Sequence, residues 1–152
     1  MIRPFKESDI FMPLAEGCRR EKEAVTMVSY TDSQFLKELW KNSDVAMTFC
    51  NKKGNPQVVW GYTNDGYFWL MFSEAKEIPF SFFRGLARSI DTAVERYGKV
   101  MTDCLMDTLE DEYFHKKIYK VGKWECIREY EENGHKWAEY GRRWKPCIMT
   151  GN

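Results

Sequence analysis

The chain has 152 residues, of which 23 are basic and 23 acidic, so its formal net charge at pH 7 is zero. This balance argues against generic binding to phosphate backbones, which needs many Lys and Arg contacts, and we expect no nucleic-acid partner. No apolar run approaches about 18 residues, so no segment is expected to span a membrane. MIRPFKESDI lacks the apolar middle of a signal peptide, which predicts a cytoplasmic protein, and the length predicts one domain over residues 1–152.

The cysteines show no pattern of metal binding or disulfide pairing. None forms a C-x-x-C pair, their number is odd, and neither His115 nor His135 lies at a metal-ligand spacing from one. We expect reduced thiols packed as small apolar side chains, and no metal site. The five are Cys18, Cys50, Cys104, Cys126 and Cys147.

The N-terminal third predicts a short strand followed by two helices. IRPF at residues 2–5 is the strand, and Ser8 or Asp9 caps a first helix that Pro13 ends or kinks. A polar run, EGCRREKE, follows, and then an apolar stretch, VTMVSY, as extended or linking chain. A clearer helix is TDSQFLKELWKN, residues 31–42, because its apolar residues form one stripe and its first residues suit an N-cap.

Three strands are predicted next, in an antiparallel meander. They cover residues 45–50, 56–62 and 67–73, and they are separated by NKKGN and by a tight turn at Asp65-Gly66. The third strand, YFWLMFS, is apolar almost throughout, which is typical of a central strand covered on both faces.

The remaining chain predicts a helix, a strand, a second helix and a hairpin. Apolar residues recur at steps of three and four over residues 79–97, where Pro79 suits the first turn and Gly98 the stop. Residues 99–107 then form a strand, and TLEDEYFHKKIYKVG forms a helix that ends at its glycine. The closing hairpin turns at Asn133-Gly134.

Together these elements predict an α+β fold with a mixed, mostly antiparallel central sheet flanked by helices, in the order β-α-α-β-β-β-α-β-α-β-β. The strand–helix–strand crossover predicts that residues 67–73 and 99–106 are parallel neighbours in one sheet. The buried face of the crossover helix is expected to carry Phe83, Leu86, Ile90 and Val94.

This order resembles the GNAT superfamily, the acyl-CoA N-acyltransferases, over essentially the whole chain. IRPFKESDI is similar to the common GNAT start, a short strand running into a capped helix, and KIYKVGKW is similar to the family's L-Y-x-K-x-G-F ending. The length, the aromatic meander, the uninterrupted central helix and the Asn-Gly hairpin further resemble the small GNAT-like internal virion and assembly proteins of short-tailed phages. That second resemblance implies a protein in the cytoplasm of a host cell or associated with the virion, with a phage or host protein as its partner.

The resemblance implies an acyl-CoA site, but its phosphate motif departs from the family's. GNAT enzymes hold the pyrophosphate on backbone N–H groups at a helix N-terminus, within Q/R-x-x-G-x-G/A. FFRGLA matches that motif at Gly85 and Ala87 but has Phe82 in place of Gln or Arg. The predicted helix also begins before Gly85, which then serves close packing on the sheet. If the cofactor site is kept, it is lined by Phe72, Ser73, Arg84, Gly85 and Ala87.

The catalytic acid also departs from the family's pattern. A tyrosine usually protonates the leaving thiolate. Aligning Gly122 with the family's glycine puts Ile118 there, while Tyr119 lies about 100° away around the helix. Tyr119 is the candidate acid if the helix ends irregularly. No general base stands out, although Glu74 and Glu77 follow the central strand.

An acidic run after residue 106 has two interpretations. Asp107, Glu110, Asp111 and Glu112 either repel a polyanionic cofactor or stabilise a helix N-terminus.

These departures favour a GNAT scaffold with a degenerate acyl-CoA site, which is non-catalytic and acts by binding a protein. No cofactor is then expected. Trp137, Tyr140 and Trp144 form an exposed aromatic patch for the partner, or Trp137 only covers the sheet. The alternative is an active N-acetyltransferase that uses acetyl-CoA. The acceptor amine and the oligomeric state stay open.

Overall fold

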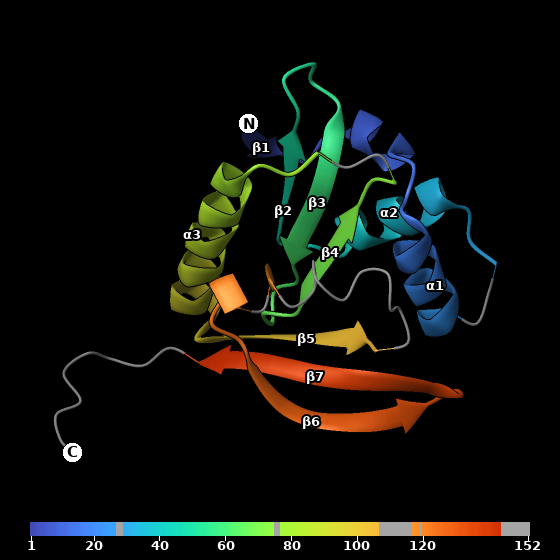
Figure 1. Cartoon of the computed structure of the whole chain (residues 1–152), viewed down its shortest axis with the longest axis vertical. Helices are drawn as coiled ribbons and strands as arrows, with labels where there is room; N and C mark the ends of the chain where they lie inside the picture. Colours follow the sequence, from blue (N-terminus) through green and yellow to red (C-terminus); the bar gives the residue numbers. More distant parts are fainter. Residues whose placement is uncertain (27–28, 75–76, 107–116, 119, 144–152) are drawn as a thin grey trace, which may run out of the picture.

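The strands form two antiparallel sheets that meet at one corner (Figure 1). The computed structural model describes residues 1–26, 29–74, 77–106, 117–118 and 120–143. The first sheet has the order β1-β2-β3-β4, and its neighbouring strands are all antiparallel. Its strands are β1 (Ile2–Pro4), β2 (Val45–Cys50), β3 (Pro56–Tyr62) and β4 (Phe68–Phe72). The predicted meander over residues 45–73 is therefore confirmed.

The second sheet has the order β5-β7-β6 and lies across the end of the first. Its strands are β5 (Lys99–Leu105), β6 (Glu125–Glu132) and β7 (His135–Arg143). The predicted hairpin joins β6 to β7. Asn133 and Gly134 both have positive φ, 54° and 78°, as a type I′ turn requires.

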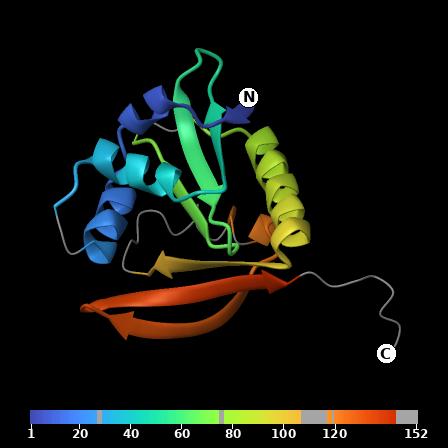
Figure 2. The same ribbon diagram turned by 180° about the vertical axis from the view of Figure 1, so that it is seen from behind.

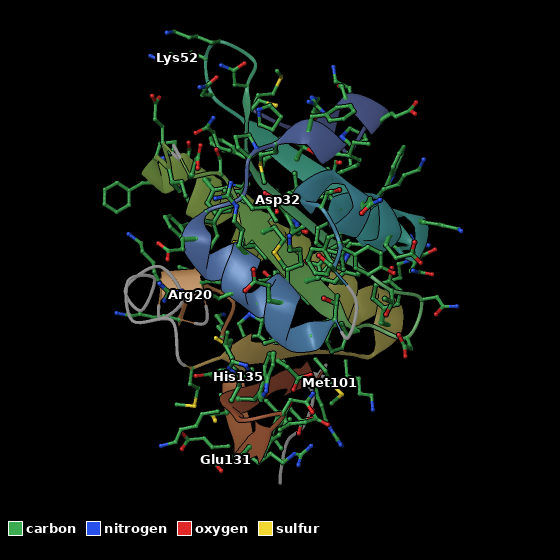
Figure 3. All side chains as sticks on the ribbon, turned by 90° about the vertical axis from the view of Figure 1, so that its right-hand side faces the viewer. Arg20, Asp32, Lys52, Met101, Glu131 and His135 are labelled. Atoms are coloured by element: carbon green, nitrogen blue, oxygen red, sulfur yellow. The ribbon has the colours of Figure 1, made fainter. Side chains whose placement is uncertain are left out.

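Helices flank the first sheet on both faces and along one edge. The longest, α3 (Phe80–Tyr97), covers one face, while α2 (Asp32–Lys41) covers the other (Figures 2 and 3). Along the outer edge of β4 lies α1 (Glu16–Val25), which follows a short 3-10 helix, η1 (Glu7–Phe11). The predicted α+β class with antiparallel sheets and flanking helices is confirmed. No helix among the described residues is long and apolar enough to cross a membrane.

Local sequence accounts for most helix ends. Thr31 caps α2 by accepting from the Gln34 N–H, and the Gln34 side chain accepts in return from the Thr31 N–H, as a capping box predicts. Gly98 ends α3 in the left-handed conformation, with φ of 80°.

The N-terminal helices differ from the sequence prediction. The polar run EGCRREKE, for which no element was predicted, forms most of α1, and its buried positions include the small residues Gly17 and Cys18 and a paired lysine, Lys22. Asp9 does not occupy the N-cap of η1 either. That position is Lys6, whose N–H donates to the Asp9 carboxylate at 2.9 Å.

The predicted parallel pairing of residues 67–73 with 99–106 is correct at one end and wrong for the rest. A single parallel bridge joins Tyr67 to Met101, and the Met101 N–H donates to the Gly66 carbonyl. Beyond it the Thr102 hydroxyl, not a backbone N–H, donates to the Phe68 carbonyl at 2.8 Å. The two strands then belong to separate sheets. Residues of α1 and α2 line the cavity between them.

The predicted core face of α3 is confirmed. Phe83, Leu86, Ile90 and Val94 are all buried, and Ile90 is fully enclosed. In the last predicted helix, Lys117, Ile118, Lys120 and Val121 are helical, and the chain leaves the helix at Gly122. The first part of that helix lies outside the described residues.

Replacing Ile90 with alanine tests the α3 core. The change removes fully buried atoms and leaves a cavity, so the free energy of unfolding should fall by about 2–5 kcal/mol in chemical denaturation. The exposed Glu95→Ala on the same helix is the control and should change stability by no more than about 0.5 kcal/mol. An Ile90→Ala loss as small as that of the control would mean that the packing of α3 is misassigned.

Candidate functional site

A small cavity opens where β4 and β5 diverge. It has a volume of about 110 Å³. Its walls combine the two strands with α1, α2 and the buried Ile118, which was expected to pack rather than to face a cleft. Along a strand, the backbone N–H and C=O groups of successive residues point to opposite edges. The N–H and C=O of Leu70 therefore point to the same outer edge of β4 as those of Phe68 and Phe72. This corner therefore places a small cavity beside the outer edge of β4.

The outer edge of β4 beyond this cavity is occupied by the segment Pro13–Cys18. The Phe72 carbonyl accepts from the Ala15 N–H at 2.9 Å, and the Phe72 N–H donates to the Cys18 sulfur at 3.4 Å. The Glu74 N–H donates to the Pro13 carbonyl at 3.1 Å, and Leu14 forms an antiparallel bridge with Ser73. The segment thus acts as a short extra strand on β4, and we call it the edge segment.

The start of α3 is lined by large apolar side chains. Its N-cap is Pro79, which has no N–H, and the Phe82 N–H already donates to the Pro79 carbonyl at 3.1 Å. The Lys117 ammonium lies over two rings of this turn, 4.3 Å from the centre of Phe80 and 4.7 Å from that of Phe83. These cation–π contacts connect the first turn of α3 to the helix before Gly122.

The structure separates the residues proposed from the sequence for cofactor binding. Gly85 lies inside α3 and faces the first sheet, where an added Cβ would collide with the Ile2 side chain. Its role is close packing, which was the alternative left open. Arg84 is exposed and Ala87 half-buried on the same helix, while Phe72 and Ser73 are buried in and after β4. Tyr119 and the acidic run from Asp107 to Glu112 lie outside the described residues.

An acidic network beside the cavity was not anticipated. The Asp103 carboxylate on β5 accepts from the Tyr67 hydroxyl at 3.0 Å and from the Tyr130 hydroxyl at 2.9 Å. Glu21 of α1 lies at the same cavity. Burial and the negative charge of Asp103 raise the pKa of Glu21 from its ordinary value of 4.5 to about 8. A carboxyl group with this pKa exchanges protons near neutral pH, which a general base requires.

The other candidate residues lie apart from this cavity. Glu74 is exposed and within 3.7 Å of Arg19, and the Glu77 N–H donates to the Gln57 side chain. Of the two alternatives for Trp137, an exposed patch or a cover for the sheet, the structure shows the second, since Trp137 is 5% exposed and packs with Leu105. Trp144 lies outside the described residues.

The described residues contain no disulfide and no metal-binding cluster. Cys18, Cys50 and Cys104 are buried free thiols, and Cys126 is an exposed one. No group of three or more His, Cys, Asp or Glu side chains in the described ranges is arranged to hold a metal ion.

Solved structures of acetyltransferases share this arrangement of sheets and helices. A protein assigned as a phosphinothricin N-acetyltransferase superposes with a TM-score of 0.67 at 11% identity, over 96% of this chain and 99% of its own. The ribosomal-protein-S5-alanine acetyltransferase from Vibrio fischeri gives 0.63 at 13% identity, over 95% and 94%. The spermidine N-acetyltransferase from Vibrio cholerae, solved with CoA and spermine, gives 0.60 at 9% identity, over 94% of each chain.

The chain has the GNAT acetyltransferase fold. At these identities the likeness shows the fold alone. No protein-family model matches the sequence, and neither does any curated protein.

Replacing Glu21 with glutamine tests the acidic network. The pKa of Glu21 is raised on folding because the folded protein favours its protonated form. The stability that this protonated form contributes is complete below about pH 4.5 and is lost as pH rises toward 8. Each pKa unit corresponds to about 1.4 kcal/mol, and partial solvent screening reduces the total. We expect Glu21→Gln to raise the free energy of unfolding by about 1–2 kcal/mol at pH 8 and to leave it almost unchanged at pH 4.5.

The measurement is urea denaturation of both proteins from pH 4.5 to 8.5. The exposed Glu23→Gln on the same helix is the matched control and should leave the pH profile unchanged. Parallel profiles for the Glu21 variant and the original chain would rule out a raised pKa.

Proposed function

We propose that this protein is a GNAT scaffold that does not bind acyl-CoA and that acts by binding another protein. The observation that carries the proposal is the occupied edge of β4. The sequence resemblance implies that pantetheine lies in the slot where the strands corresponding to β4 and β5 splay apart. In this chain the edge segment already uses the N–H and C=O of Phe72 on that side.

Freeing this edge carries a large energetic cost. The Leu14 side chain is fully buried, and exposing it costs about 2–3 kcal/mol. The backbone hydrogen bonds of Ala15 and Glu74 with the edge contribute about 1 kcal/mol each. Losing about 4–5 kcal/mol weakens binding by about three orders of magnitude, so a micromolar site would bind only at millimolar cofactor.

The start of α3 supports the same conclusion. A pyrophosphate site at a helix N-terminus needs accessible N–H groups and small side chains around them. Here a proline caps the helix, and three of the first four residues are phenylalanines, Phe80, Phe82 and Phe83. The small residue Gly85 lies more than a turn further along and faces β1.

One observation favours a second candidate, an N-acetyltransferase that uses acetyl-CoA. Glu21, with its pKa raised to about 8, lies at the cavity between β4 and β5. In an enzyme it would take the proton from the acceptor amine, and Tyr119 would be the candidate acid.

The resemblance to small phage GNAT-like proteins supplies a setting for the binding role. We propose that the protein acts in the virion, in its assembly or in contact with the host, in the cytoplasm of the infected cell. Mass spectrometry of purified particles and of complexes captured during infection checks this setting. If the protein is absent from both the particles and the captured complexes, the phage role is excluded and the binding role is unaffected.

Titration with acetyl-CoA decides between the two candidates. By isothermal calorimetry we expect no binding tighter than about 1 mM, which corresponds to about −4 kcal/mol. The Vibrio cholerae spermidine N-acetyltransferase, which was solved with CoA, is the positive control under the same conditions.

Micromolar binding would overturn the non-catalytic proposal and favour the enzyme. Tyr119→Phe and Glu21→Gln would then each be assayed by release of CoA thiol with a panel of amines. Loss of a general acid or base should slow the reaction about 100-fold or more.

A further inference from the structure

A second, much larger hollow lies at the opposite end of the first sheet from the cavity described above. It is an open groove of about 1400 Å³ between η1, the β2–β3 loop and the chain that leads into α3. Figure 3 shows Lys52 at the tip of the β2–β3 loop, far from Met101 and His135 of the second sheet. The groove exceeds the about 300–1000 Å³ of a typical small-molecule pocket, and it is open, as a site for a polypeptide segment is.

Large apolar side chains stand exposed in this groove. Met1 is 73% exposed and Phe11 is 71% exposed, and both line it. A monomeric protein seldom leaves such side chains together on one surface without a binding role. Trp137, the anchor expected from the sequence, is buried by contrast.

The charge around the groove is positive. Lys52 and Lys53 form one rim. Glu77 is the single acidic residue among the described residues that line it. The start of α3 also points its positive dipole end to this side through Pro79 and Ser81.

The wall between these features is preformed. Gln57, which is 4% exposed, donates through Nε2 to the Asn55 and Pro56 carbonyls and accepts at Oε1 from the Glu77 N–H. These bonds connect the β2–β3 loop to the chain before α3. A wall that is already ordered loses little conformational entropy when a ligand binds.

We propose that this groove is the protein-binding surface of the molecule and that it takes an acidic segment of a partner that carries a large apolar side chain. Positive rim groups attract the acidic residues, and the exposed Phe11 and Met1 receive the apolar side chain. The groove offers too few cations for a nucleic acid, which depends on many phosphate contacts. The proposal rests on the proposed function, since it names the surface and the partner chemistry of that binding role.

Selection from a random library tests this without a known partner. The folded full chain is used to select 12-residue peptides displayed on yeast, at low and at high salt. We expect the enriched peptides to be acidic and to contain Phe, Trp, Leu or Ile, with binding that weakens as salt rises. An absence of enrichment, or an enriched pool without net negative charge, would overturn the proposal.

Two matched pairs of variants locate the binding of an enriched peptide. Lys52→Glu combined with Lys53→Glu should weaken binding at least tenfold, whereas reversal of Lys37 and Lys41, two exposed lysines of α2, should leave it unchanged. Phe11→Ser should likewise weaken it at least tenfold, whereas Ile127→Ser, at an exposed apolar residue of β6, should not. Equal effects of test and control variants would place the peptide elsewhere and defeat the proposal.

Titrating the same preparation with acetyl-CoA separates this inference from the proposed function. Cofactor binding combined with groove-dependent peptide binding would remove the non-catalytic role and keep the groove. A failed selection with no cofactor binding would remove the groove and keep the scaffold. A third outcome is that acetyl-CoA or duplex DNA displaces the bound peptide from the original chain but does not bind the Lys52/Lys53 variant. This outcome would identify the groove as a general anion site and overturn the partner assignment.

Discussion

A backbone N–H at a strand edge donates to one partner at a time, and at the end of the outer edge of β4 the N–H and C=O of Phe72 are already bonded to the edge segment. That occupancy depends on how the chain enters from β1. The buried Asp9 carboxylate accepts from both guanidinium nitrogens of Arg3, from the Lys6 N–H and from the Thr48 hydroxyl. Burial opposes its ionisation, but these bonds prevail and lower the pKa of Asp9. They fix η1 against β1 and β2, and Pro13 then begins the edge segment.

Turn and cap residues made most of the fold predictable. Asp65-Gly66, Gly98 and Asn133-Gly134 mark three chain reversals or stops. The elements β4, α3 and β5 were predicted to within one or two residues because apolar periodicity is strong there. The first helix after η1 was missed for a physical reason. Its buried face includes Lys22, whose ammonium donates to Asp32 at 2.9 Å and to the Tyr30 carbonyl. A charged residue at a buried position interrupts the apolar pattern that would have predicted the helix.

The site was less predictable because its groups come from distant parts of the chain. Phe82 and Pro79 correctly indicated that the phosphate motif is displaced, since helix phase is a local property. Nothing near Glu21 in the sequence distinguishes it from its glutamate neighbour Glu23, because its environment is created by Asp103 on β5. The contact between Cys18 and Phe72 likewise joins residues that only the folded chain brings together.

The division of the strands into two sheets bears on how the domain opens. Along the ladders, β5 is joined to β4 through one bridge, whereas it pairs with β7 along its whole length, from Lys99–Arg143 to Leu105–Trp137. The far end of the second sheet rests on its own small cluster of Ala24, Leu105 and Trp137. Near Lys99 the second sheet is held to the rest of the molecule by Val100 and Tyr140, which pack in the main core, and by the ion pair of Arg142 with Asp91. The far end of the sheet lacks these contacts, so its amide protons can exchange through a local opening while β1 to β4 stay protected.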